Sequence, residues 1–204
     1  MEYIPGKSGT QLLEATSEPT EREAVYRQMA LGIQELLRIP IPPNPRPTAI
    51  DGGLIRHIIF EQQEAPRPYQ SVDQLEQHFN LFLQWTKREP KILGLSREPM
   101  VFCHSDAWPG NFIINKQGHV TVVDFSEVSI LPSSFAKYAI TPSVKDHEYS
   151  LLPWIDVPST DGVDNTRALF AATNPMIMGA GSFAKAGKRI PGYDRIPSPI
   201  PPVS

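Results

Sequence analysis

The pattern of hydrophobic and polar residues near the start of the chain predicts an amphipathic helix. Thr20, followed three residues later by Glu23, has the spacing of an N-terminal capping box, and apolar residues then recur at intervals of three and four. The helix is expected to end before Pro40, because a residue that precedes proline is pushed out of helical geometry. The apolar face expected to pack on the core consists of Ala24, Met29, Leu31, Ile33, Leu36 and Leu37.

A second stretch predicts another amphipathic helix. Ser71 has the position of an N-cap with Gln74 as its box partner, and the helix should stop by Pro90. Its expected apolar face is formed by Leu75, His78, Phe79, Phe82 and Trp85. Between the two helices, residues 51–53 (Asp-Gly-Gly) predict a turn.

The pattern changes in the middle of the chain. Residues 100–103 are short and apolar, which fits either a buried strand or an extended segment. Residues 112–115 and 119–125 are rich in strand-forming residues and are joined by a short loop that ends in Gly118, which predicts a β-hairpin. Residues 161–172 predict one more helix. Helices followed by a hairpin indicate an α+β fold.

Composition is that of one globular domain with a core: 204 residues, of which 40% are hydrophobic and 20% charged. Ten of the 22 prolines gather in two places, five in a connector at 40–47 and five at the end of the chain at 191–202. We expect the connector to be an ordered, extended loop. We expect residues 187–204 to be a disordered tail.

Charge and the chain start narrow the class of function. The net charge of −3 lacks the basic excess of a nucleic-acid-binding protein. The N-terminus does not look like a signal peptide, and no run approaches the roughly 20 apolar residues that a membrane span needs. The single cysteine, Cys103, excludes an internal disulfide and fits a reducing compartment. A soluble, cytoplasmic protein is therefore expected.

Three polar residues of the segment 101–125 point to a chemistry. The hairpin returns the chain to where it left, so Asp124 should lie near Asn111, with Asp106 one loop earlier. Carboxylate and amide oxygens suit Mg²⁺, which takes one or two carboxylates together with substrate phosphates. An ionised aspartate such as Asp106 can also accept a proton from a hydroxyl. This set of residues suits phosphoryl transfer.

The same residues resemble a known pattern. The run from His104 through Asp106 to Asn111 is similar to the kinase catalytic loop H-x-D-x-x-x-x-N, and Val123-Asp124-Phe125 resembles the metal-binding aspartate motif that follows it. The resemblance implies that Asp106 is the catalytic base and that Asn111 and Asp124 hold magnesium. His104 would be a structural support.

The details resemble the aminoglycoside phosphotransferase and choline kinase branch, in the form of its fungal members. Residues 1–6 look like that branch's hinge, with Glu2, Tyr3 and Ile4 against the adenine of ATP. Roughly a hundred residues separate the hinge from His104, more than in protein kinases, and no Ala-Pro-Glu element follows. The resemblance implies the large, mostly helical lobe of a kinase-like fold over residues 7–186, ATP and Mg²⁺ as cofactors, and a small-molecule hydroxyl as acceptor.

Two departures leave alternatives open. Ser126 stands where the kinase motif has glycine, although this branch often lacks that glycine. The family's glycine-rich loop and ATP-binding lysine lie upstream of the hinge, so the chain is expected to start inside the fold and to be weakly active or inactive by itself. It is then either part of a longer enzyme or a catalytically silent binding protein. The acceptor and the oligomeric state are not predicted.

Other conspicuous residues have simpler interpretations. Trp108 and Pro109 either shape the catalytic loop or contact substrate, with loop shape preferred. The remaining histidines lack the spacing of metal ligands and are expected on the surface or in the core. Cys103 is expected to pack beneath the catalytic loop.

Overall fold

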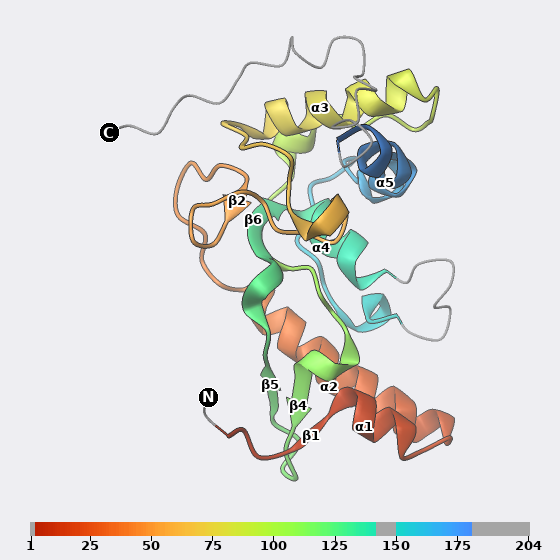
Figure 1. Cartoon of the computed structure of the whole chain (residues 1–204). Helices are drawn as coiled ribbons and strands as arrows, with labels where there is room; N and C mark the ends of the chain where they lie inside the picture. Colours follow the sequence, from red (N-terminus) through yellow and green to blue (C-terminus); the bar gives the residue numbers. More distant parts are fainter. Residues whose placement is uncertain (1–2, 142–149, 181–204) are drawn as a thin grey trace.

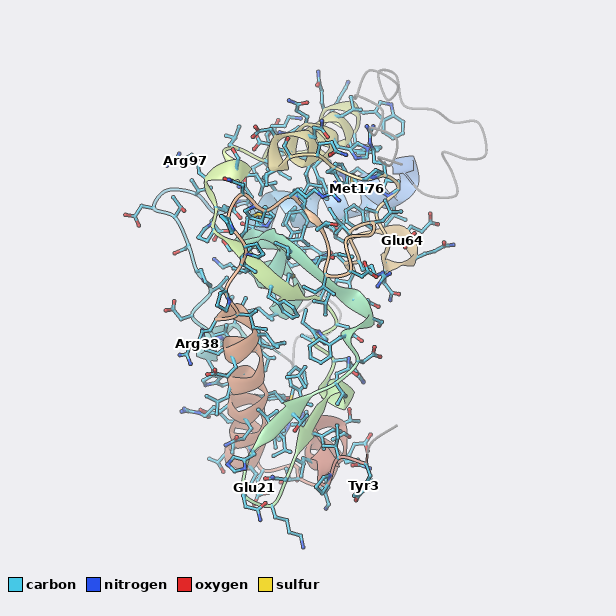
Figure 2. The ribbon with its side chains drawn as sticks, turned by 90° about the vertical axis from the view of Figure 1, so that its left-hand side faces the viewer. Tyr3, Glu21, Arg38, Glu64, Arg97 and Met176 are labelled. Atoms are coloured by element: carbon cyan, nitrogen blue, oxygen red, sulfur yellow. The ribbon has the colours of Figure 1, made fainter. Side chains whose placement is uncertain are left out.

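The computed structural model describes residues 3–141 and 150–180. It is an α+β structure, elongated in both views, with α3 and α5 at one end and α1 with the β4–β5 hairpin at the other (Figures 1 and 2). The helices are α1 (Gly9–Glu14), α2 (Pro19–Leu37), α3 (Val72–Trp85), α4 (Ser133–Ile140) and α5 (Thr166–Ala180). The strands are β1 (Lys7–Ser8), β2 (Thr48–Ala49), β3 (Met100–His104), β4 (Phe112–Ile114), β5 (Val120–Val122) and β6 (Val128–Pro132).

The strands form two small antiparallel sheets, ordered β1-β4-β5 and β2-β6-β3. In the second sheet, Met100 pairs with Pro132 and His104 pairs with Val128, so the whole of β3 lies along β6. Residues 100–103 are therefore a buried strand rather than an extended lead-in. The start of α4 lies at one end of this ladder and the residues that follow His104 lie at the other.

The predicted hairpin is present. Phe112 pairs with Val122, and Ile114 pairs with Val120. The turn is closed by Gly118, whose φ of +80° suits glycine, and by the Asn115 side chain, which accepts hydrogen bonds from two backbone amides of the turn. Each strand has three residues, fewer than expected, because Asn115 is drawn into the turn and Val123 lies past the last ladder pair.

The predicted start of α2 is wrong. The helix begins at Pro19, with Glu18 as N-cap and no side-chain cap hydrogen bond, so Thr20 lies inside the first turn. Proline is favoured at this first helical position because its missing N–H has no partner there in any case. The buried face is also rotated from the expected one: Leu31 is 55% exposed, and the buried side includes Tyr26, Met29, Ala30, Ile33 and Leu37.

The predicted start of α3 is confirmed, since the Ser71 hydroxyl accepts a hydrogen bond from the Gln74 amide. The Gln74 side chain does not complete the box but accepts from the Gln70 amide. The expected apolar face is buried except for Trp85, which is 45% exposed at the last helical position. The helix packs against α5.

The last helix starts later than predicted. α5 begins at Thr166 because the preceding residues turn at Gly162 (φ +73°), and the Asp164 carboxylate then accepts the Thr166 amide. The short helix α1 was not predicted, although Ser8 and Gln11 form a full capping box there. Residues 51–53 form the expected turn, in which Asp51 accepts the Gly53 amide.

A buried carboxylate joins the last two helices to the segment before β3. Glu98 is 5% exposed, and its two oxygens accept hydrogen bonds from the Ser134 amide (2.8 Å), the Ser134 hydroxyl (2.7 Å) and the Asn165 side-chain amide (2.7 Å). Asn165 also bonds the backbone of Leu93 in both directions. The starts of α4 and α5 are thus fixed to one another through side chains rather than through backbone pairing.

Two of the expected core histidines are completely buried, His57 and His78. The His57 Nε2–H donates to the Phe135 carbonyl oxygen, and its Nδ1 accepts from the Ile59 amide, so both nitrogens are satisfied in the neutral ring. Burial lowers the pKa of His57 to about 4. Burial and the charge of Arg67 lower the pKa of His78 to about 3.

The depressed pKa of His57 predicts acid sensitivity. Above the unfolded pKa of 6.5 the ring is neutral in both states, and as the pH falls toward about 4 only the unfolded chain binds the proton. The free energy of unfolding should therefore decrease by about 2 kcal/mol more between pH 7 and pH 5 than in His57→Gln, measured by urea denaturation. His119→Gln, at an exposed position, is the matched control and should behave like the parent protein. Equal pH dependence in parent and His57→Gln would contradict the assignment.

Glu2 and the proline-rich segment 187–204 lie outside the described residues. None of the described helices is both long enough and apolar enough to cross a membrane.

Candidate active site

The loop between β3 and β4 holds Asp106 and Asn111 against each other. The Asn111 side-chain amide nitrogen donates to the Asp106 carboxylate Oδ2 (2.8 Å) and to the Asp106 backbone carbonyl (3.0 Å). Both partners are acceptors only, which determines that the nitrogen, not the oxygen, of Asn111 faces them. Asp106 Oδ1 makes no hydrogen bond within the described chain, and this oxygen remains available for a further partner.

Asp124 lies across the hairpin from Asn111. The Val123 amide donates to the Asn111 carbonyl oxygen (2.8 Å), which places the end of β5 beside the start of β4, as predicted. Asp124 itself has left-handed backbone angles (φ 59°, ψ 75°), which turn its exposed side chain out of the strand direction. The three predicted residues thus gather at one end of the hairpin, although no hydrogen bond joins the Asp124 side chain to Asp106 or Asn111.

The Asp124 carboxylate is held by its own turn. Its Oδ1 accepts hydrogen bonds from the Ser126 hydroxyl (2.7 Å) and the Ser126 amide (3.3 Å). These bonds, and the nearby His104, lower the pKa of Asp124 below its usual range against a smaller opposing effect of burial. Ser126, noted in the sequence only as a replacement for glycine, stabilises the ionised form of the carboxylate.

This hydrogen bond gives a direct prediction. Ser126→Ala should raise the pKa of Asp124, because the hydroxyl that stabilises the ionised form is removed. A pH titration of the Asp124 carboxyl carbon by NMR measures the shift. Ser126→Thr keeps a hydroxyl at the same position and serves as the control. An unchanged pKa in the alanine variant would show that the turn, not the hydroxyl, sets the ionisation.

His104 links the loop to the strand beyond it. Its Nε2–H donates to the Val123 carbonyl oxygen (3.3 Å), and its ring meets the Phe125 ring edge to face, with centroids 5.4 Å apart. The side chain is 4% exposed. These contacts fit the expected role of structural support, and they position the residue immediately before Asp124.

Ser105 and Glu127 belong to the site but were missed from the sequence. The buried Ser105 donates its amide to the Glu127 carbonyl oxygen (3.0 Å), and its hydroxyl accepts the Ile58 amide (3.2 Å) while contacting Glu127. Burial and the negative charges of Asp106 and Asp124 raise the pKa of the Glu127 carboxyl, with the Ser105 hydroxyl acting in the opposite direction. Two neighbouring carboxylates therefore act on the Glu127 carboxyl here.

The residues fit a magnesium site of the kind that relies on substrate. Among residues 3–141 and 150–180, no three His, Cys, Asp or Glu side chains are grouped to hold a metal. Asn111 uses its nitrogen for Asp106, which leaves its Oδ1 without a hydrogen bond in the described chain. That oxygen and the ionised Asp124 would supply two ligands, and Mg²⁺ commonly takes the rest from water and phosphates.

The other predicted residues lie around this centre. Tyr3, which is 85% exposed, and Ile4 precede β1, the strand that pairs with β4 along the edge of the hairpin. Pro109 is buried, consistent with loop shaping, whereas Trp108 is 59% exposed and lines a cavity of about 310 Å³ with Thr10, Leu13, Glu14 and Arg22. Cys103 is buried beneath the loop as predicted, and burial raises the pKa of its thiol.

Comparison with known families supports the resemblance found in the motifs. Residues 1–132 match the model of the phosphotransferase enzyme family, which is more than half of the chain and includes Asp106, Asn111 and Asp124. The chain belongs to this phosphotransferase family. No curated protein matches it. Within the family match, the segments that gather at the hairpin are those whose motifs resemble the family in sequence.

Proposed function

We propose that the protein transfers a phosphoryl group from ATP to a hydroxyl of a small molecule. The observation that carries this is the 2.8 Å hydrogen bond by which Asn111 holds the Asp106 carboxylate, beside Asp124 across the hairpin. Phosphoryl transfer needs little covalent chemistry from a protein and relies on positioning and charge neutralisation. A fixed carboxylate next to two further oxygen ligands meets that need.

Asp106 is the proposed catalytic base. With Oδ2 bonded to Asn111, the carboxylate cannot rotate freely, and Oδ1 faces no partner in the described chain. An acceptor hydroxyl hydrogen-bonded to Oδ1 would be oriented toward the phosphorus and would release its proton to that oxygen. His104 and Ser105 support this loop from beneath.

Asn111 Oδ1 and the Asp124 carboxylate are proposed to hold Mg²⁺, which would neutralise the charge of the ATP phosphates. The Ser126 hydrogen bonds favour the ionised form of Asp124, which suits this role. Glu127, whose pKa is raised by burial and by the negative charges of Asp106 and Asp124, would experience less repulsion once a cation is bound.

The proposal extends to the fold and the nucleotide. Residues 7–186 would be the catalytic lobe of a kinase-like fold, and residues 1–6 the hinge. Glu2, Tyr3 and Ile4 would contact the adenine, a role supported by the run of β1 along the catalytic hairpin. Acceptor binding is proposed near Ile58, Trp108 and Phe125, three partly exposed apolar residues that flank the loop.

Transfer of label from [γ-³²P]ATP to a panel of sugars, amino alcohols and aminoglycosides tests the proposal. We expect weak labelling of at least one acceptor in the presence of Mg²⁺ and none after chelation. Nucleotide-induced thermal stabilisation, measured in parallel, separates binding from catalysis. Binding of ATP or acceptor without transfer would favour a silent binding protein instead. The absence of both binding and transfer would refute the assignment.

A further inference from the structure

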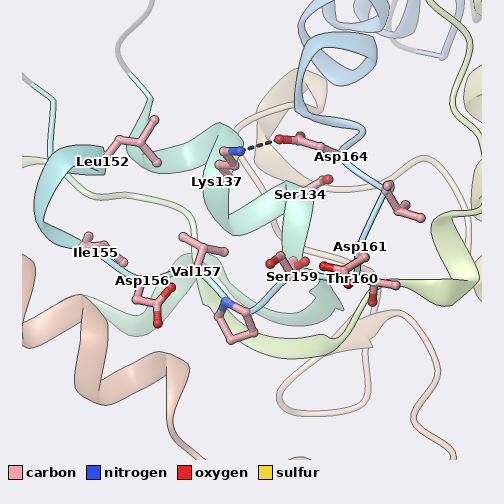
Figure 3. Close-up of a pocket in the computed structure, with 14 residues that line it drawn as sticks. Ser134, Lys137, Leu152, Ile155, Asp156, Val157, Ser159, Thr160, Asp161 and Asp164 are labelled. Atoms are coloured by element: carbon pink, nitrogen blue, oxygen red, sulfur yellow. Dashed lines mark hydrogen bonds and ion pairs between the residues drawn. The ribbon is translucent and has the colours of Figure 1, made fainter.

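One cavity lies away from Asp106. It has a volume of about 790 Å³ and is formed by the start of α4 and the segment 155–164 (Figure 3). Because Pro132 pairs with Met100 while Val128 pairs with His104, the start of α4 and the catalytic loop lie at opposite ends of the β3–β6 ladder. A five-residue strand spans roughly 16 Å, so this cavity is separate from the proposed active site.

The wall of the cavity carries excess negative charge. Three carboxylates, Asp156, Asp161 and Asp164, line it together with one ammonium group, Lys137. Lys137 is paired with Asp164, as the dashed line in Figure 3 marks. The carboxylates of Asp156 and Asp161 make no ion pair or hydrogen bond to any described residue, which leaves two negative charges at the cavity without a partner.

A serine side chain on the wall adds a second, independent observation. Ser133 lines the cavity, is 5% exposed, and its side chain makes no hydrogen bond to the described part of the chain. The neighbouring Ser134 differs, because its hydroxyl is fully used by Glu98 and Asn165. A ligand in the cavity could therefore bond the Ser133 hydroxyl without displacing a partner from the described chain.

The cavity wall is held in place before any ligand arrives. Gln34 on α2 bonds the backbone of Asp156 in both directions (2.8 and 3.2 Å), and the Thr160 hydroxyl donates to the Arg97 carbonyl oxygen (2.7 Å). A preformed site loses less entropy on binding. The volume also lies in the usual range for small-molecule sites.

We propose that this cavity binds a small organic cation, an aliphatic polyamine, with its ammonium groups on Asp156 and Asp161 and an N–H donated to Ser133. A metal ion suits the site less well, because the described residues contain no group of three acidic, histidine or cysteine side chains placed to hold one. Charge spread along a cavity wall instead complements an extended cation with several separated charges. The proposal does not depend on phosphoryl transfer.

Isothermal titration of the protein with spermidine and putrescine at low salt tests this. Asp156→Asn combined with Asp161→Asn should weaken spermidine binding by at least about tenfold, equivalent to about 1.4 kcal/mol, and added salt should weaken binding to the parent protein. Ser159→Trp, which fills the cavity from an exposed position of its wall, should also reduce binding. Thermal melting of each variant confirms that it is folded.

Glu18→Gln combined with Glu64→Gln removes two exposed carboxylates elsewhere on the surface and is the matched control. Its affinity for spermidine should equal that of the parent protein. Equal affinity in the pocket variant and the control would overturn the proposal, as would the absence of spermidine binding at millimolar concentration. Binding of Mg²⁺ alone, lost in the pocket variant, would also overturn it in favour of a metal site.

Discussion

Asp106→Asn is expected to lower kcat for phosphoryl transfer by about 10²–10⁴-fold, the usual contribution of a positioned general base. The asparagine oxygen can still accept the hydrogen bond from Asn111, so the loop should keep its shape. What the variant lacks is an oxygen basic enough to take the hydroxyl proton. The effect should therefore fall on kcat, with little change in the KM for ATP.

Steady-state kinetics with the best acceptor from the panel measures this effect. Asp73→Asn, a change of the same kind at an exposed position in the first turn of α3, is the control and should leave kcat unchanged. A melting temperature close to that of the parent protein would show that lost activity is not lost folding. If Asp106→Asn keeps most of its activity, Asp106 is not the base.

Glu98→Ala should lower the free energy of unfolding by about 3–5 kcal/mol, because it leaves three buried donors from Ser134 and Asn165 without an acceptor. Glu98 has no cationic partner among these contacts, so hydrogen bonds alone stabilise its carboxylate. Glu98→Gln keeps one acceptor oxygen at nearly the same volume and should cost less than the alanine variant.

Urea denaturation of the parent protein, Glu98→Ala and Glu98→Gln measures these differences in the free energy of unfolding. Glu35→Ala removes a carboxylate whose ion pair with Arg38 is exposed, and it should change the free energy of unfolding by no more than about 0.5 kcal/mol. A loss of similar size in Glu98→Ala would mean that water replaces the carboxylate without penalty. The proposed link between the starts of α4 and α5 would then be wrong.

Sequence reasoning succeeded where contacts are local. The hairpin could be predicted because Gly118 and the flanking strand residues lie within a dozen positions of each other, and this was enough to place Asn111 near Asp124. It failed at the start of α2, where the helix begins at Pro19 and not at the apparent capping box of Thr20 and Glu23. Trp85 was assigned to the core by its spacing alone, although the helix ends there.

The parts of the site that could not be predicted depend on distant segments. The Ser105 hydroxyl accepts a hydrogen bond from the Ile58 amide, 47 residues earlier, and no local sequence pattern predicts that contact. The cavity wall likewise joins α4 to residues 155–164 and is held by Gln34, 122 positions away. A signal for this turn was present, since an aspartate side chain commonly accepts a hydrogen bond from the backbone amide two residues later, here that of Ser126.

The Ser105 hydroxyl joins the loop that carries Asp106 to a region without any of the proposed catalytic or metal-binding residues. By accepting the Ile58 amide, it ties the long excursion between α2 and α3 to the residue immediately before Asp106. During evolution, that excursion could change length and sequence to accommodate a new acceptor only while returning one backbone N–H to the same place. Drift elsewhere in the excursion would then be tolerated, whereas a proline at position 58 would remove that N–H and disconnect the two.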